Sequence, residues 1–323
     1  MAQNKLVSCV EIFPAQTIFL AWYEKTIFNK VIHRISLSQV LRKINRKLKI
    51  KIDDFNPDVL LIFKGMEIFP STLKWVKAKG IKLASYNPDN PFIFSGRGSG
   101  NSHLSLSIPL YDLFLSYDTC ICAQMEKQYH VTSKLLPFGY DVSEELFTLC
   151  THEPEREKVC FVGNMDKNRL HFLNELSRAG VKMDLYGMNW NKASLEANII
   201  FKGPVFEDDL WKTLRSYRVQ LNLMRIHNPD SHNMRTFEIG GIGGVQLAPD
   251  TTDHKQFFEN GKEIFLYSNL DSCIREIRKI LDLSTEEANK VRLYARNKST
   301  TNGYSYKDRA ATLAFYLKEL VNG

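Results

Sequence analysis

Short apolar runs of strand length alternate with helical segments along most of the chain. The run VLLIFKG at 59–65 is one, and a helical stretch over 71–79 separates it from the next, at 81–86. Continuous apolar strands separated by helices are typical of parallel sheets that helices cover on both faces. The chain is therefore expected to be an α/β protein. The same pattern predicts further strands at 6–12, 113–116, 158–163, 182–186, 199–202, 219–223, 245–248 and 263–266.

The length of 323 residues suggests two domains, each able to bury its own core. The alternation is interrupted once, at the acid-rich segment 143–156, which is predicted to be an irregular linker. Two consecutive α/β domains place a ligand cleft between the carboxyl ends of their strands. The expected organisation is an N-terminal domain over 1–142, the linker, a C-terminal domain over 157–302, and a helix over 303–323 that can pack back on the N-terminal domain.

Composition excludes several classes of protein. With 44% hydrophobic and 24% charged residues, the chain is not expected to be disordered. A membrane span needs about 20 apolar residues, and the best uncharged run, 12–23, is much shorter. The start, MAQNK, is not followed by the apolar core and cleavage site of a signal peptide. We therefore expect a soluble, cytoplasmic protein.

The net charge of +7 comes from one segment, 25–51, because the rest of the chain is nearly neutral. Just upstream, apolar residues recur at near-helical spacing, with Phe19 among the aromatic ones. Two interpretations stay open: contact with an anionic membrane surface, or a core-facing helix followed by a solvated basic one. Nucleic-acid binding is not expected, because aromatic residues do not alternate with the Lys and Arg residues of this segment. The apolar positions are Ile18, Trp22, Ile27, Val31 and Ile35, and the bases are Lys25, Lys30, Arg34, Arg42, Lys43, Arg46, Lys47, Lys49 and Lys51.

The most informative stretch is NMRTFEIGGIGGVQLA, residues 233–248. It places Arg235 and Glu238 in the first turn of a short predicted helix, 234–241, which ends in glycines before a strand. Backbone N–H groups at a helix N-terminus bind phosphate, and an adjacent Arg adds donors. A carboxylate one turn further on can accept hydrogen bonds from two adjacent sugar hydroxyls. A purely structural Arg–Glu pair is the alternative, with glycines that only allow close packing.

This stretch resembles the N-x-R-x-F-E segment of glycosyltransferases of the GT-B fold. The resemblance is to the "glycosyl transferases group 1" type, which includes spore-maturation-like proteins and is related to glycosyltransferase family four. It extends over about residues 56–320 and implies two Rossmann-like domains whose parallel sheets face an interdomain cleft. Such enzymes usually open with a further β–α unit, so the N-terminal domain either lacks it or uses 6–12 as its first strand. Other landmarks in order are FVGN at 161–164 with Arg169, YGMNW at 186–190, IFKGPV at 200–205 and QLNL at 220–223.

The resemblance also implies roles for single residues. Glu238 would bind the ribose or sugar hydroxyls of the donor, and Arg235 with Arg169 would bind its pyrophosphate. Asp230 stands eight residues before Glu238, where retaining enzymes of family four carry a glutamate. The shorter side chain leaves the stereochemistry open. The remaining donor-binding candidates are Gly163, Asn164, Tyr186, Gly187, Asn222, Asn233, Gly243 and Gly244.

The expected site uses no metal and no cofactor. A GT-B site meets the charge of the departing nucleoside diphosphate with Arg residues and helix N-termini, and the sequence has no convincing Asp-x-Asp metal motif. The acceptor hydroxyl needs a base, or an oxygen of the leaving phosphate, to take its proton. Asp89 and His103 are the candidate bases, because 87–92 follows a predicted strand; His103 can equally be an ordinary loop histidine.

The expected function is therefore transfer of a sugar from a nucleotide-sugar donor to a glycan or lipid-linked acceptor, a hexosyltransferase-type reaction (EC 2.4). A role in bacterial surface-polysaccharide or glycoconjugate synthesis fits this chemistry, with a peripheral position at the inner membrane face if the basic segment binds lipid. The alternatives are a nucleotide-sugar epimerase or hydrolase of the GT-B fold, or a non-catalytic sugar- or nucleotide-binding protein of the same fold.

Overall fold

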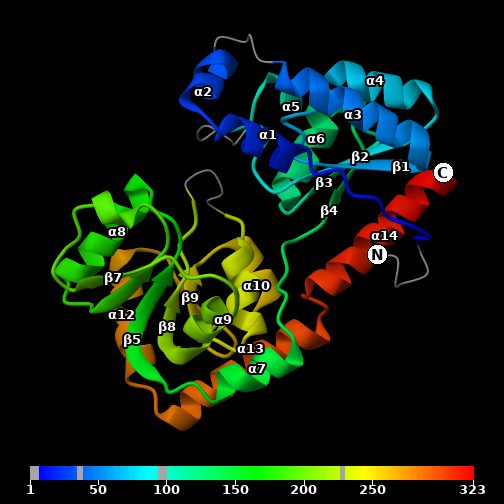
Figure 1. The fold of residues 1–323 in the computed structure, drawn as a ribbon. Coiled ribbons are helices and arrows are strands. Elements are labelled where there is room, and N and C mark those ends of the chain that lie inside the picture. The colour runs from blue at the N-terminus through cyan, green and yellow to red at the C-terminus, as the bar shows by residue number, and fades with distance from the viewer. Residues whose placement is uncertain (1–6, 35–38, 94–99, 226–229) are drawn as a thin grey trace. The chain divides into compact units, whose positions relative to one another are not determined.

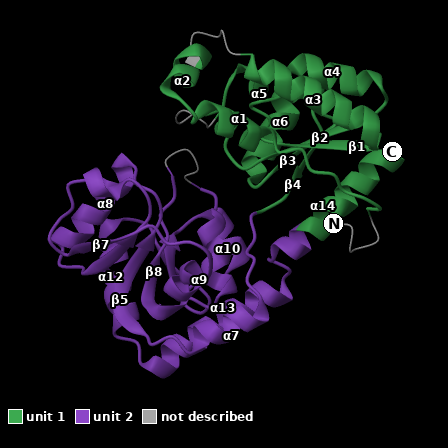
Figure 2. Cartoon of the chain, viewed as in Figure 1, with its two compact units in different colours: residues 1–137, 310–323 green, residues 138–309 purple. Residues whose placement is uncertain are grey.

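The computed structural model describes residues 7–34, 39–93, 100–225 and 230–323. The chain divides into two compact units, shown in different colours in Figure 2. Unit 1 contains residues 1–137 and 310–323, and unit 2 contains residues 138–309. Each unit is built around its own parallel sheet.

The sheet of unit 1 has four strands in the order β1-β2-β3-β4, and every pairing is parallel (Figure 1). The predicted strands at 59–65, 81–86 and 113–116 are confirmed, and β4 was not foreseen. The strands are β1 (Val59–Phe63), β2 (Lys82–Asn87), β3 (Leu113–Ser116) and β4 (Ser133–Leu135). The helices are α1 (Ala15–Tyr23), α2 (Ile27–Arg34), α3 (Val40–Phe55), α4 (Pro70–Ala78), α5 (Ser102–Ser107) and α6 (Thr119–Tyr129).

The strand predicted at 6–12 is wrong. Residues 7–14 form neither helix nor strand, and Val10 and Ile12 are exposed. A strand needs a neighbouring strand to pair with its backbone N–H and C=O groups. Strand β1 pairs along its length with β2, whereas residues 7–14 are not part of the sheet. The segment therefore does not take the place of a first strand in unit 1.

The sheet of unit 2 has six strands in the order β10-β9-β8-β5-β6-β7, again all parallel. From β5 the chain builds outward through β6 to β7, and from β8 it builds the other way through β9 to β10. The order therefore reverses between β5 and β8, which is where ligands bind in open α/β sheets. The strands are β5 (Arg156–Val162), β6 (Met183–Tyr186), β7 (Ile199–Gly203), β8 (Tyr217–Leu221), β9 (Gln246–Pro249) and β10 (Phe265–Tyr267).

Helices of unit 2 pack on this sheet and supply its core. Phe161 and Leu221 from the two central strands are buried together with Trp190 and Ile277. All six predicted strands of this part of the chain are confirmed to within a few residues. The helices are α7 (Glu144–Thr151), α8 (Lys167–Arg178), α9 (Glu207–Ser216), α10 (Met234–Gly241), α11 (Thr252–Phe257), α12 (Leu270–Leu281) and α13 (Thr285–Thr301).

The segment 143–156 is not an irregular linker, because most of it forms α7. The Ser143 hydroxyl caps this helix by accepting a hydrogen bond from the N–H of Leu146, and Glu144 and Glu145 occupy the first turn. A capping hydroxyl and first-turn acids both stabilise a helix N-terminus. Cys150 is fully buried in a core cluster with Tyr217. The acidic residues Glu144 and Glu145, which favoured the prediction of a linker, therefore belong to the first turn of a helix of unit 2.

The last helix, α14 (Tyr306–Asn322), begins in unit 2 and continues into unit 1. Leu313 is buried with Leu115 of β3, and Glu319 forms an ion pair with Lys134 of β4 at 2.6 Å. Across the described part of the chain, no helix combines the length and the apolar character needed to span a bilayer.

Candidate functional site

Helix α10 begins at the point of unit 2 where the strand order reverses. Its cap, Asn233, accepts a hydrogen bond from the N–H of Thr236, and the Thr236 hydroxyl accepts one from the N–H of Asn233. The Asn233 amide also donates to Oδ1 of Asn222, the residue after β8, at 2.7 Å. The cap therefore ties the positive end of the helix to the carboxyl end of β8.

Arg235 and Glu238 form an ion pair within α10 and are both largely buried. Arg235 Nε also donates to the carbonyl of Val162, the last residue of β5, at 3.2 Å. Two residues predicted to contact the donor are thus brought together at the ends of the two central strands. Because the guanidinium is fixed by Val162 and Glu238, it is held in place before any ligand arrives.

Arg169, from the first turn of α8, spans the same two strand ends. Its guanidinium donates to the carbonyl of Asn164, after β5, at 3.1 Å and to that of Leu223, after β8, at 3.0 Å. It also lies over the Phe161 ring. Burial is the largest cause that lowers the pKa of Arg169 below its ordinary value.

Asp166, the ion-pair partner of Arg169 at 3.4 Å, raises this pKa, and the positive charges of Arg225 and Arg235 lower it. Arg225 is exposed, and no acidic group within the described ranges forms an ion pair with it. Sequence reasoning missed Arg225, although an Arg just after a predicted strand was the available signal. Three arginines against two acidic partners, Asp166 and Glu238, leave a net positive charge near a helix N-terminus, which is suited to an anion such as a diphosphate.

The loops after β5 and β6 touch each other beside these arginines. Gly187 has a φ of +135°, and a Cβ there would lie 2.1 Å from the carbonyl oxygen of Gly163, so only glycine fits. Asn164 Oδ1 accepts a hydrogen bond from the N–H of Met188 at 3.0 Å, and the Trp190 indole donates to the Gly163 carbonyl at 2.7 Å. Gly163, Asn164 and Gly187 therefore build this edge of the site, and their contact with a donor stays a prediction.

Three further candidates lie elsewhere in unit 2. The Tyr186 hydroxyl contacts that of Tyr217 at 2.9 Å, which in turn donates to Asp184. Gly243 and Gly244 follow the C-terminal end of α10, the opposite end from the arginines, and a Cβ on Gly244 would lie 2.6 Å from a backbone oxygen. Close packing, the structural alternative, accounts for both glycines.

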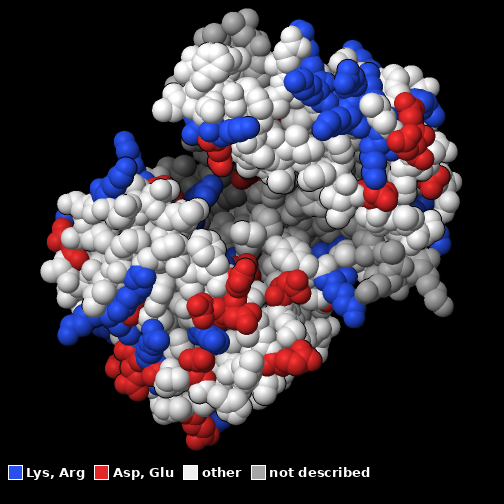
Figure 3. All heavy atoms as spheres, in the orientation of Figure 1, with Lys and Arg blue, Asp and Glu red and all other residues white. Residues whose placement is uncertain are grey.

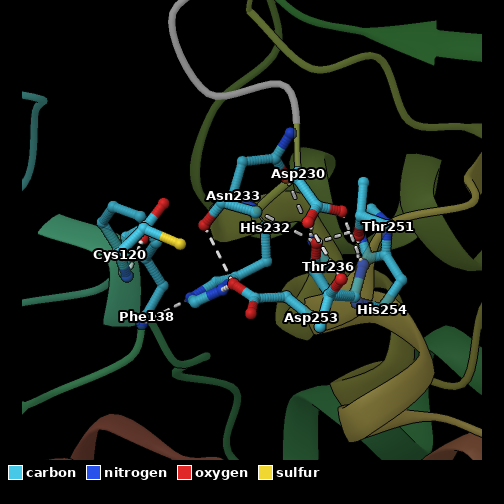
Figure 4. A network of polar contacts seen from close by, with 12 residues as sticks. Cys120, Phe138, Asp230, His232, Asn233, Thr236, Thr251, Asp253 and His254 are labelled. Carbon is cyan, nitrogen blue, oxygen red and sulfur yellow. Dashed lines mark hydrogen bonds and ion pairs between the residues drawn. The ribbon is translucent and has the colours of Figure 1, made fainter. Parts of the chain in front are cut away.

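A buried polar network lies beneath the start of α10 (Figure 4). His254 Nδ1 donates to the carbonyl of Pro249 at 2.8 Å, so its Nε2 accepts from the Thr236 hydroxyl at 3.0 Å. In the same region His232 Nδ1 donates to Asp253 at 2.6 Å. Sequence reasoning missed these residues, because nothing in their local pattern indicates that they meet the helix cap.

Asp230 is directed toward the start of α11 (Figure 4). Its carboxylate accepts hydrogen bonds from the N–H and the hydroxyl of Thr252, at 2.8 and 2.9 Å. These bonds lower the pKa of Asp230. The side chain thus anchors α11, and no described contact joins it to Glu238; its predicted catalytic role stays a prediction.

The neutral state of His254 makes the stability of the fold depend on pH. Burial is the largest cause that lowers the pKa of His254 from 6.5 to about 4. Between these values the unfolded chain binds a proton that the folded one does not. The free energy of unfolding should therefore fall as the pH drops from 6.5 toward 4, by at most about 1.4 kcal/mol per pH unit from this group.

Urea unfolding of the wild-type chain and of His254→Gln at several pH values measures this contribution. The wild-type curve should be steeper than that of the variant within this window and parallel to it above pH 7. Parallel curves throughout would show that His254 is not the group responsible.

Asp89 and His103 belong to unit 1. Asp89 follows β2 and forms an ion pair with Lys64, which follows β1, so both lie at the carboxyl edge of that sheet. His103 lies in α5 against the Phe69 ring, and burial lowers the pKa of its imidazole. Among the described residues, no hydrogen bond or ion pair joins Asp89 to His103, and Lys64 was not foreseen from the sequence.

The described residues contain no group of three or more His, Cys, Asp or Glu side chains placed to hold a metal ion.

Comparisons with known proteins address the fold and the family. Residues 168–314 match the family model described as glycosyl transferase-like. The chain is similar to sucrose-phosphate synthase from Thermosynechococcus elongatus, with 12% identity and a TM-score of 0.63 over 87% of this chain and 78% of that one. It is also similar to HepE of Anabaena in complex with UDP and glucose (12% identity, TM-score 0.61, 88% and 82% covered). A glycosyltransferase from Rickettsia africae gives 13% identity and a TM-score of 0.61, with 87% and 82% covered.

No curated protein sequence matches the chain. At identities this low, the similarity to these structures shows the fold alone. That fold agrees with the two parallel sheets of this chain. The likeness to spore-maturation proteins and to family four stays a prediction. Residues 168–314 match the glycosyl transferase-like family model, within a chain that has the GT-B fold.

Proposed function

We propose that the chain transfers a glycosyl group from a nucleoside diphosphate sugar to an acceptor hydroxyl. The observation that carries this proposal is that Arg169 and Arg235 bond to backbone carbonyls at and just after the ends of β5 and β8, where the strand order of unit 2 reverses, with Arg225 two residues after Leu223. Such a site suits the diphosphate of a donor, because the negative charge of the donor is concentrated on the two phosphates that link the nucleoside to the sugar. The match to a glycosyl transferase-like family supports the same reading.

In the proposed reaction, the bond between the anomeric carbon and the phosphate oxygen breaks, and the acceptor oxygen bonds to that carbon. The bonding electrons leave with the nucleoside diphosphate. Arg225 and Arg235 stabilise this growing negative charge, and Arg169 holds the ends of β5 and β8 in position through its two carbonyl contacts. The Arg235 guanidinium, which Val162 and Glu238 hold in place, needs little reorganisation as the charge develops, and this favours the transition state.

Glu238 would position the sugar or ribose of the donor. Without a ligand its carboxylate is paired with Arg235. When a diphosphate takes up the charge of Arg235, the carboxylate can accept hydrogen bonds from two adjacent hydroxyls instead. The ion pair would therefore keep the site ready for a ligand that carries both groups.

The proton of the acceptor hydroxyl would pass to Asp89 or to an oxygen of the leaving phosphate. Asp89 stands at the carboxyl edge of the unit 1 sheet, and its ion pair with Lys64 fixes the direction of the carboxylate. We propose a glycan or lipid-linked acceptor of bacterial surface polysaccharide or glycoconjugate synthesis, which rests on the resemblance described above.

Release of nucleoside diphosphate from a panel of sugar nucleotides tests the proposal. A transferase releases the diphosphate faster when a suitable acceptor is added. Release that no acceptor accelerates indicates a hydrolase or epimerase, and binding without release indicates a non-catalytic protein. Either result overturns the proposed transfer.

We also predict that activity is retained in excess EDTA. Arg225 and Arg235, together with the α10 N-terminus, supply the positive charge that a divalent ion provides in metal-dependent transferases. The rate with EDTA should stay within about twofold of the untreated rate. Loss of activity that Mn²⁺ or Mg²⁺ restores would contradict this electrostatic account.

A further inference from the structure

Helix α3 separates its apolar and basic residues onto two faces. One face of α3 is buried against the rest of unit 1. Its residues recur at a spacing of four: Val40, Ile44, Leu48 and Ile52. The opposite face carries four exposed bases along the first half of the helix, which we call the basic face, and exposed Ile50, Asp53 and Asp54 follow them. The members of the basic face are Arg42, Lys43, Arg46 and Lys47.

The basic face lacks the partners that the neighbouring lysines have. Lys51 is paired with Glu11 at 2.7 Å, and Lys49 lies over the Trp75 ring. Within the described ranges, no ion pair involves a residue of the basic face. Figure 3 shows Lys and Arg side chains gathered over α3 on this side of unit 1. Four clustered, unpaired cations form a surface suited to a polyanion.

A second exposed surface on α2 is apolar. Ile27, Phe28 and Val31 lie at positions i, i+1 and i+4 of this helix, with 80%, 69% and 47% of their surface exposed. We call these three residues the apolar face. Contiguous exposed apolar residues are unusual on a monomer and mark interaction sites.

The hairpin of α1 and α2 is held together by other residues. The rings of Phe19, Trp22 and Tyr23 surround His33, and the Asn29 amide donates to the Trp22 carbonyl at 2.6 Å. Phe19 and Trp22 are therefore half-buried, and the exposed apolar residues are those of α2. No residue of α1 is fully buried, so the expected core-facing helix is not observed there; Ile35 and the side chain of Arg34 lie outside the described residues.

We propose that the basic face and the apolar face dock unit 1 on a membrane surface that contains anionic lipid. The cations would contact lipid headgroups, and the apolar side chains of α2 would enter the boundary between headgroups and acyl chains. The apolar face favours a bilayer over nucleic acid, because aliphatic side chains have no complementary surface on a phosphate backbone. This inference does not depend on the proposed function, since vesicle binding is measured without a substrate.

Sedimentation with vesicles tests the basic face. The wild-type chain should sediment with phosphatidylglycerol–phosphatidylcholine vesicles and stay in the supernatant with phosphatidylcholine alone. The variant R42Q/K43Q/R46Q/K47Q should bind anionic vesicles at least about tenfold more weakly. The control K182Q/K192Q/R275Q/R278Q loses the same charge from exposed positions of unit 2 and should bind like the wild type.

A second pair of variants tests the apolar face at physiological salt, where attraction between exposed charges is screened. The variant I27S/F28S/V31S should lose most of the remaining binding. The control I200S/F206S/L293S changes equally exposed apolar residues of unit 2 and should keep it. Circular dichroism of each variant shows whether its fold is retained.

Three outcomes would overturn the proposal. The wild-type chain could stay in the supernatant with anionic vesicles even at low salt. The basic-face variant and its control could lose binding equally, which would indicate a general effect of net charge. The chain could also bind a nucleic acid of equal charge density more tightly than vesicles, which would assign the basic face to a different polyanion.

Discussion

Replacing Arg235 with alanine should weaken nucleoside diphosphate binding by about 1.5–3 kcal/mol, or roughly 10- to 150-fold. Arg235 is held by Val162 and Glu238 at the start of α10, so its charge is placed before the ligand binds. The variant also leaves the Glu238 carboxylate without its cation, which adds repulsion against a diphosphate. Isothermal titration calorimetry with UDP, GDP, CDP and dTDP measures the loss.

Arg178 offers a matched control for this experiment. It forms an i,i+3 ion pair with Glu175 and a second ion pair with Glu196, on the exposed side of α8, and lies in the same unit. Arg178→Ala should leave nucleoside diphosphate affinity unchanged. Equal affinity of wild type and Arg235→Ala, with both folded by circular dichroism, would remove Arg235 from the phosphate site.

Glu238→Gln is expected to affect turnover more than binding. The substitution keeps the size of the side chain and removes its charge, so Arg235 loses its acidic partner and the site becomes more positive. The loss of a charged acceptor of the ribose hydroxyls opposes this gain, so affinity for nucleoside diphosphate should change less than in Arg235→Ala. Turnover at saturating donor should fall by about 10- to 100-fold, because an amide replaces the charged acceptor of the donor hydroxyls.

Steady-state kinetics with a varied donor separates these two effects. Glu175→Gln, which removes the acid of the matched pair on α8, should leave both parameters unchanged. A wild-type kcat for Glu238→Gln would exclude the carboxylate from the reaction and leave the ion pair a purely structural feature of α10.

Most of the fold followed from local pattern. The strands of unit 2 are short apolar runs between helices, and a buried parallel strand needs such a run, so the sequence located them to within a few residues. The run at 6–12 has similar composition but lies outside any sheet, because pairing depends on a neighbour that local sequence does not reveal. Helix α7 was missed because its first-turn acids look like the composition of a linker.

The candidate site was only partly predictable for the same reason. Arg235 and Glu238 lie in one recognisable segment, and the structure brings them together. Arg225 comes from the segment after β8, and its charge reaches Arg169 only because β5 and β8 are neighbours in the sheet. The contact between Thr236 and His254 joins two helices, so tertiary structure alone reveals it.

A crystal structure with the nucleoside diphosphate that binds most tightly tests the central claim most directly. The account predicts diphosphate oxygens within hydrogen-bond distance of the Arg225 and Arg235 guanidinium groups, beside the N-terminus of α10. It also predicts that Glu238 turns from Arg235 toward a hydroxyl of the ribose. A diphosphate bound away from these arginines, with the Arg235–Glu238 pair intact, would contradict the assignment of this site.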